Sequence, residues 1–150
     1  MREQIKQLLK NSVYRAIGET ANGIGVVNGD GRSLRVLMYH KVNDVPGNRM
    51  SMPVSIFDEQ MAQLRELGYT VVDLDAVLGH YVEGAALPDG AVLITFDDGY
   101  RDNLENAAPV LHKHGYPAVQ FVPLAFVGDR QPLPHEEHLA QSGVINRTAQ

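Results

Sequence analysis

The chain contains no cysteine, which excludes disulfide cross-links, thiolate metal ligands and cysteine nucleophiles at once. It also lacks an excess of positive charge, because 13 Lys and Arg stand against 18 Asp and Glu, for a net charge of −5. Without a basic field, a protein has little to attract a nucleic acid or an anionic membrane. No stretch approaches the about 20 apolar residues that a membrane-spanning helix needs. We therefore expect neither a nucleic-acid partner nor a membrane span.

The first 33 residues differ in pattern from the rest of the chain. Residues 1–17 place apolar and basic side chains at helical spacing, and residues 18–31 are rich in glycine and asparagine. This predicts an amphipathic helix and a linker over 1–33, followed by one domain over 34–150. The helix would pack on the rest of the protein or, as a weaker alternative, lie on a membrane surface. No continuous apolar core of a signal peptide is present, so a cytoplasmic location is the default expectation.

From residue 34 onward, strand-like segments alternate with amphipathic helical ones. Strands are predicted over 34–39, 69–72, 91–96 and 117–123, and helices over 55–67, 73–81 and 102–114. The segment 43–53 is predicted to be a loop, and Leu104 is predicted to lie on the inner side of the third helix. Ser55 is the predicted cap of the first helix, Asp73 and Asp75 are predicted to start the second, and Asp102 or Asn103 could cap the third. Short β–α–β connections indicate parallel strands with crossover helices, and hence an α/β fold.

Two adjacent carboxylates, Asp97 and Asp98, follow the apolar run 91–96 and precede Gly99. His40 follows the strand predicted over 34–39 in the same way. Function in parallel α/β folds gathers at the carboxyl ends of the strands, so these side chains should lie near one another. Two carboxylates this close repel unless a cation, a shared proton or strong donors are present. Either a metal binds there, or one carboxylate acts as a base; the alternative is an ordinary Asp-Gly turn beside a strand-end histidine.

The other histidines have weaker claims to a functional role. His112 and His114 lie near the end of a predicted helix, where positive side chains favour the helix dipole, and we interpret them and His80 as structural. The remaining two, His135 and His138, are three residues apart and could share one helix face as metal ligands. The intervening Glu136-Glu137 favours instead the start of a solvated helix over 135–141.

Taken together, three segments resemble the polysaccharide deacetylase family, carbohydrate esterase family 4, which shares the NodB-homology domain. The segments are Leu-Met-Tyr-His-Lys-Val over 37–42, the spaced pattern Phe-Gln-Leu-Gly-Tyr over 57–69, and Thr-Phe-Asp-Asp-Gly-Tyr-Arg-Asp-Asn over 95–103. The resemblance covers about residues 34–145 and is most specific from about residue 91 onward. It implies an irregular (β/α) barrel, of which this chain would carry parallel βαβ units of an incomplete barrel.

The resemblance also implies a metal-dependent hydrolase that removes N-acetyl groups from an amino-sugar polymer, with chitin, peptidoglycan and poly-N-acetylglucosamine all open as substrates. By this resemblance Asp97 is the general base, Asp98 a ligand of a divalent metal, usually Zn²⁺, and His40 the general acid. The family's two metal histidines lie in a His-Ser/Thr-x-x-His motif expected after residue 145, and residues 146–150 do not contain it. We therefore expect a fragment with impaired activity, although the family's members are often exported and active outside the cell.

Two further classes of function stay open at this point. A non-catalytic module could bind carbohydrate or self-associate through an unpaired sheet edge. A receiver-type phosphotransfer domain also clusters aspartates at strand ends, but it would need a lysine at the end of a later strand. The candidate, Lys113, falls inside a predicted helix.

Overall fold

The computed structural model describes residues 33–45, 48, 50–127, 133–137 and 141. The helix predicted over 1–17, the linker over 18–31 and the residues beyond 141 therefore lie outside the described part of the chain. Within that part, no helix combines the length and the apolar character needed to cross a membrane.

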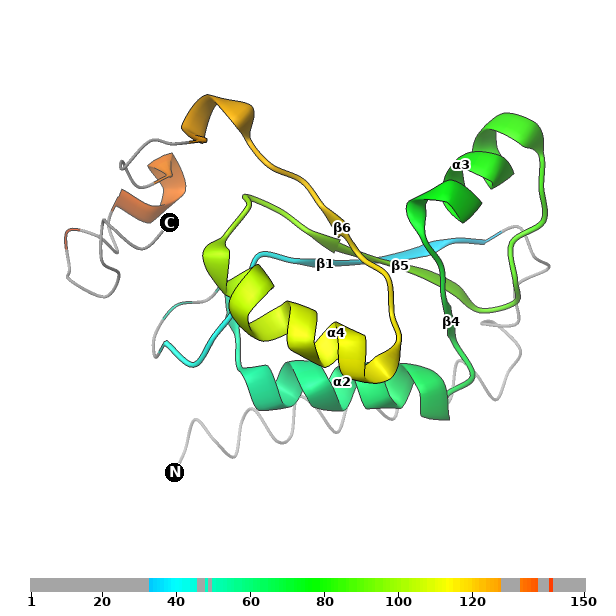
Figure 1. Ribbon diagram of the computed structural model, residues 1–150, viewed down its shortest axis with the longest axis horizontal. Coiled ribbons are helices and arrows are strands. Elements are labelled where there is room, and N and C mark those ends of the chain that lie inside the picture. The colour runs from blue at the N-terminus through cyan, green and yellow to red at the C-terminus, as the bar shows by residue number, and fades with distance from the viewer. Residues whose placement is uncertain (1–32, 46–47, 49, 128–132, 138–140, 142–150) are drawn as a thin grey trace.

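A parallel sheet built around strand β5 (Ala91–Phe96) forms the centre of the molecule (Figure 1). Strand β1 (Arg35–Tyr39) pairs with β5 from Val92 to Phe96. Strand β4 (Thr70–Val71) pairs with the beginning of β5, and strand β6 (Val119–Gln120) pairs with its end. Because β1 occupies one edge of β5, the strands β4 and β6 share the other edge, and the sheet divides there.

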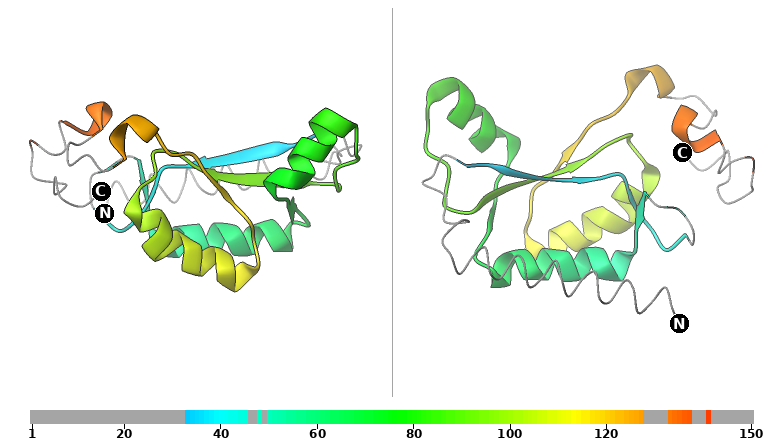
Figure 2. Two further views of the ribbon diagram at one scale, coloured as in Figure 1. Left: turned by 45° about the horizontal axis from the view of Figure 1, so that its top comes forward. Right: turned by 180° about the vertical axis from the view of Figure 1, so that it is seen from behind.

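Three helical segments connect these strands in the predicted order. Helix α2 (Val54–Glu66) precedes β4, helix α3 (Leu74–Glu83) precedes β5, and a π-helical turn (Asn103–Ala107) leads into helix α4 (Ala108–His114) before β6. Helices α2 and α4 pack side by side on one face of the sheet, and α3 lies beyond its opposite side (Figure 2). The α/β fold with parallel strands and crossover helices is confirmed.

The main core lies between the sheet and the helices α2 and α4. The rings of Tyr39, Phe57 and Phe96 meet there, with centroids 5.0–5.9 Å apart. Strand β1 alternates, so that Leu37 and Tyr39 join this core while Met38 is 61% exposed on the other face. Strand β5 differs, since all six of its residues are buried.

Two of the predicted helix caps are wrong. Helix α2 begins at Val54 rather than after Ser55, because Pro53 already sets the chain in an extended conformation (φ −57°, ψ 138°) and serves as the N-cap residue. The Asp102 side chain caps nothing and binds Asn43 instead. By contrast, the predicted start of α3 is confirmed, since Asp73 is its N-cap residue and the Asp73 carboxylate accepts a hydrogen bond of 2.8 Å from the backbone N–H of Ala76.

The sequence pattern also misses two local features near the strand ends. The segment 43–53 was expected to be a loop, but it contains β3 (Ser51–Met52), which pairs in parallel with β2 (Lys41–Val42). Strands of two residues are too short to show a periodicity. The predicted inner position of Leu104 is also wrong, because the π-helical turn changes the residue spacing and leaves Leu104 75% exposed.

Candidate active site at the strand ends

The ends of strands β1 and β5 are tied together where the candidate residues begin. The backbone N–H of Asp97 donates a 2.9 Å hydrogen bond to the carbonyl of Tyr39, which extends the pairing of the two strands by one step. His40 follows Tyr39 directly, and Asp98 follows Asp97. The parallel pairing therefore brings His40 and the two aspartates to one edge of the sheet, as the sequence predicts.

A left-handed turn fixes the direction in which Asp98 leaves the strand. Asp98 has a φ of 70° and is the one described non-glycine residue with a positive value. This conformation costs an L-residue about 1–2 kcal/mol, although the short polar side chain of aspartate tolerates it better than most. Gly99 continues the turn at φ 69°, and a Cβ atom there would lie 3.2 Å from Cγ1 of Val122. The turn thus favours glycine at position 99, and it turns the chain away from the direction of β5 at Asp98.

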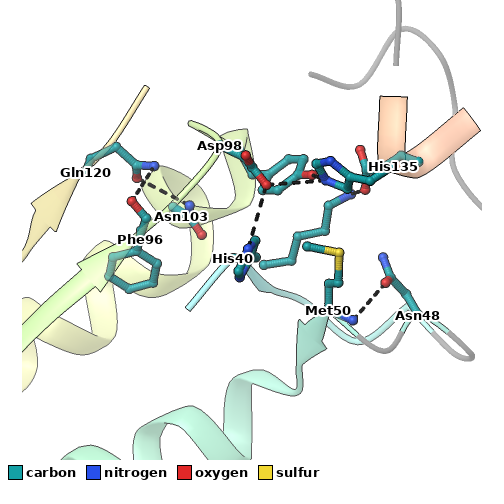
Figure 3. A network of polar contacts seen from close by, with 11 residues as sticks. His40, Asn48, Met50, Phe96, Asp98, Asn103, Gln120 and His135 are labelled. Atoms are coloured by element: carbon teal, nitrogen blue, oxygen red, sulfur yellow. Dashed lines mark hydrogen bonds and ion pairs between the residues drawn. The ribbon is translucent and has the colours of Figure 1, made fainter. Parts of the chain in front are cut away.

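Two histidines flank the Asp98 carboxylate (Figure 3). The Oδ2 atom of Asp98 lies 4.0 Å from Nε2 of His40 and 3.4 Å from Nε2 of His135. The three side chains remain partly open to solvent, with 26% of His40, 21% of Asp98 and 41% of His135 exposed. An opening of this kind lets a substrate or an ion reach the carboxylate.

The Oδ2 atom of Asp98 is itself buried and has no hydrogen-bond partner among the described residues. An ionised carboxylate oxygen in that state is costly unless a cation or a donor approaches it. Asp98 therefore suits a positively charged partner, either a metal ion or the imidazolium of His135, whose Nε2 lies 3.4 Å from the same oxygen. Within the described ranges, however, no group of three or more His, Asp or Glu side chains is arranged to hold a metal ion. The described residues thus provide one suitable carboxylate and no complete ligand set.

Three buried side chains, Tyr100, Lys41 and Glu136, form a series of contacts that ends at His135. Tyr100 Oη lies 3.1 Å from Nε2 of His135, and the Nζ atom of Lys41 lies 4.1 Å from the centre of the Tyr100 ring. Lys41 Nζ also lies 2.5 Å from Oε1 of Glu136, whose side chain is completely buried. Burial, together with the negative charges of Glu136 and Asp98, raises the pKa of the Tyr100 phenol, which therefore keeps its proton at neutral pH.

The environment of Glu136 contradicts the prediction of a solvated helix start. The segment forms a 3₁₀ turn over Pro134–Glu136, and Glu136 is 0% exposed because Lys41 compensates its charge inside the protein. Residues 138–140 of the helix predicted over 135–141, which include His138, lie outside the described residues.

Asp102 adds a further carboxylate four residues after Asp98 in the chain. Its Oδ2 atom accepts a hydrogen bond from Nδ2 of Asn43, which lies just after strand β2. Burial is the main cause that raises the pKa of this carboxyl, while Asn43 opposes the shift. A second contact, from Nδ2 of Asn106 to the carbonyl of Val42 at 2.8 Å, fixes the same connection between β2 and the π-helical turn. These contacts hold strand β2, which contains Lys41 and directly follows His40.

The histidines interpreted as structural lie away from this edge. His80 Nδ1 is 2.6 Å from the carbonyl of Ala85, at the end of α3. His114 Nε2 is 2.7 Å from Oδ1 of Asp58, in a contact between α4 and α2. His112 occupies the last turn of α4, as expected. None of these contacts involves Asp97 or Asp98.

The sequence placed His40, Asp97 and Asp98 together but discounted His135 and gave no role to Lys41, Tyr100 or Glu136. Of the two aspartates, Asp98 is the one that His40 and His135 contact. The contact with His135 joins segments far apart in the chain across a stretch without a regular pattern, so spacing offers no way to find it.

Comparison with known proteins points to one family. Residues 84–144 match the family model described as polysaccharide deacetylase, a range that includes the expected specific part from about residue 91. The Bacillus subtilis (strain 168) protein YxkH, which is named after the polysaccharide deacetylases, is 34% identical over 113 residues, covering 74% of this chain and 40% of that protein. The poly-beta-1,6-N-acetyl-D-glucosamine N-deacetylase of Escherichia coli (strain K12) is 36% identical over 85 residues, covering 55% of this chain and 13% of that protein.

Solved structures share the fold as well. A de-N-acetylase from Aggregatibacter actinomycetemcomitans superimposes with a TM-score of 0.61 at 23% identity, covering 75% of this chain and 52% of that one. The protein IcaB from Ammonifex degensii gives a TM-score of 0.56 at 36% identity, covering 63% of this chain and 39% of that one. The chain therefore corresponds to part of a larger (β/α)-barrel fold, and it spans less than half the length of the curated relatives described above.

Proposed function

Because the chain belongs to the polysaccharide deacetylase family, we propose that it carries part of the active site of a hydrolase that removes N-acetyl groups from an amino-sugar polymer. The observation that carries the proposal is the Asp98 carboxylate, held in a left-handed turn at the strand ends with the His40 imidazole 4.0 Å from it. The E. coli relative is named for poly-beta-1,6-N-acetyl-D-glucosamine, and this polymer is the first substrate to test.

We assign three roles to the residues at the strand ends. Asp97 is the general base that takes a proton from the attacking water as the oxygen bonds to the amide carbon. His40 is the general acid that protonates the leaving nitrogen as the carbon–nitrogen bond breaks, giving acetate and a free amine. An imidazole suits this role because its usual pKa lies close to neutral pH.

Asp98 is the residue that would hold a divalent metal ion, for which Zn²⁺ is the first candidate. Its buried Oδ2 atom without a hydrogen bond supports this assignment. The metal would polarise the amide carbonyl of the substrate. A single carboxylate binds zinc weakly, and the described residues do not complete a ligand set, so further ligands have to come from elsewhere.

The test measures acetate release from N-acetylated β-1,6-glucosamine oligomers with and without added Zn²⁺, alongside zinc binding by calorimetry. Asp98→Asn should abolish zinc binding, and Asp97→Asn should keep it while turnover falls about 10²–10⁴-fold, the usual range for a lost acid or base. Loss of the acid in His40→Ala should also slow the reaction while zinc binding is kept.

The matched control is Asp89→Asn, which changes an exposed aspartate that also precedes a glycine with positive φ, Gly90, but lies at the other end of β5. It should leave zinc binding and turnover unchanged. If Asp98→Asn binds zinc as well as the unmodified chain does, the ligand assignment is wrong. If Asp97→Asn turns over normally, another group is the base.

A second candidate function is a non-catalytic module that binds carbohydrate or self-associates. The incomplete ligand set among the described residues favours it, as does strand β1, which pairs with β5 alone in the described part of the sheet. This candidate predicts oligosaccharide binding without acetate release, and a dimer or larger species by light scattering. Acetate release that depends on Asp97 would exclude it.

A further inference from the structure

A buried ion pair lies directly behind the two histidines that flank Asp98. The pair joins Nζ of Lys41 to Oε1 of Glu136 at 2.5 Å, with 9% of one side chain and 0% of the other exposed. Lys41 follows His40 in the chain, and Glu136 follows His135. The pair therefore connects the strand end that carries one histidine to the segment that carries the other.

Tyr100 contacts both this ion pair and His135 in the open site. Lys41 Nζ lies 4.1 Å from the centre of its ring, and its hydroxyl lies 3.1 Å from Nε2 of His135. Tyr100 is also the second residue after Asp98, so its backbone is fixed by the same left-handed turn. A chain of contacts thus runs from Glu136 through Lys41 and Tyr100 to the ring of His135.

We propose that Glu136 is a positioning residue, whose ion pair with Lys41 holds residues 133–137 against the strand ends and keeps the His135 imidazole beside Asp98. The segment then forms one wall of the site. The consequence for the reaction rests on the function proposed above, whereas the positioning itself does not.

The competing explanation is that apolar burial alone anchors the segment. Leu133 is 4% exposed, so its burial gives the turn a second attachment, and a 2.8 Å hydrogen bond from the N–H of Glu136 to the Leu133 carbonyl holds the turn itself together. A buried ion pair differs from this attachment because removing one partner leaves the other charge uncompensated away from water. Without Lys41, the Glu136 carboxylate will move towards solvent and the segment will move with it. Without the charge of Glu136, the segment loses its ionic contact with Lys41 on β2.

The absence of cysteine makes a direct test practical, since two introduced cysteines carry the only spin labels. One label pair, at Glu59→Cys and Glu137→Cys, reports the distance from α2 to the segment by double electron–electron resonance. A second pair, at Glu59→Cys and Glu83→Cys, reports the distance from α2 to α3 and so monitors the rest of the fold. All three positions are exposed.

In Glu136→Gln and in Lys41→Met, the distance distribution to the segment should broaden while the distribution from α2 to α3 stays narrow. The matched control, Lys113→Gln, breaks an exposed ion pair with Asp58 and should leave both distributions unchanged. An unchanged distribution to the segment in both variants would overturn the proposal, because Leu133 would then suffice as an anchor. Broadening of both distributions would also overturn it, since the pair would then support the whole fold.

The effect of Glu136 on the reaction is measured in a separate assay of acetate release. Where the unmodified chain releases acetate, Glu136→Gln should lower kcat/KM about 10–100-fold, since small displacements of positioned groups cost rate on this scale. Its exposed neighbour provides the control, and Glu137→Gln should not change kcat/KM. An unmodified chain that releases no acetate would count against the proposed function and not against the positioning, which the spin-label comparison decides on its own. A normal kcat/KM in Glu136→Gln would overturn the inference that residues 133–137 form one wall of the site.

Discussion

Strand β5 and helix α3 are both rich in apolar residues, yet the protein treats them in opposite ways. All six residues of β5 are buried, whereas α3 has no buried residue. Strand β5 has strands on both edges and the helices α2 and α4 across one face. Helix α3 contributes Val77 to a small cluster at the beginning of β5, while Leu78 is 49% and Tyr81 68% exposed.

The difference shows that the apolar content of a segment does not by itself decide whether the segment is buried. Burial also needs other strands or helices that pack against it. An apolar side chain gains stability only when other groups remove its surface from water. Neighbouring strands and helices do this for β5, whereas the described residues do it for α3 only at its first turns. Three predictions address this comparison.

The largest expected effect separates the two regions directly. Ile94→Ala, in the middle of β5, should lower the free energy of unfolding by about 2–5 kcal/mol, because it leaves a cavity in a fully buried position. Leu78→Ala, on α3, should change it by no more than about 0.5 kcal/mol. Urea unfolding followed by circular dichroism measures both values. A large loss in Leu78→Ala would break the comparison, because it would mean that α3 is covered in solution.

The second effect appears at alkaline pH and compares two tyrosines. Burial raises the pKa of Tyr39 to about 12, from the usual 10.0. Between these values the unfolded chain has lost the proton that the folded chain keeps, so stability should fall as the pH rises, by at most about 2–3 kcal/mol. Tyr39→Phe should flatten this slope in urea titrations at pH 9–12, leaving the part that Tyr100 contributes. The control Tyr81→Phe, at an exposed position on α3, should leave the slope as it is.

The smallest effect concerns the surface of the packed helices. Lys113 and His114 on α4 contact the carboxylate of Asp58 on α2 and lower its pKa. A lowered pKa stabilises the folded state above the ordinary pKa of the carboxyl, and this contribution disappears as the pH falls through the folded value. Asp58→Asn should therefore lower the melting temperature slightly at pH 6–7, with a difference that vanishes towards pH 3. A melting-temperature difference as large as that of Ile94→Ala would contradict the view that the buried core contributes more to stability than this surface contact does.

Much of the fold followed from the sequence because its patterns are local. The sequence predicts a buried strand over 91–96, a helix that starts at Asp73, and a parallel sheet from the βαβ order; the structure agrees with each. The errors have local causes too. Pro53 moved the start of α2, a π-helical turn displaced Leu104, and two-residue strands escaped notice within the segment 43–53.

The sequence by itself determined that Asp97, Asp98 and His40 follow strands, and the parallel order then required them to meet at one edge. Only the tertiary structure decided which charges are buried and which histidine joins them. Glu136 looks like a surface residue in a polar run, and it is buried because Lys41 reaches it from β2. His135 lies beside Asp98 for the same reason. Such contacts join segments distant in the chain, and no local pattern encodes them, because burying a charge depends on a partner that folding must first bring close.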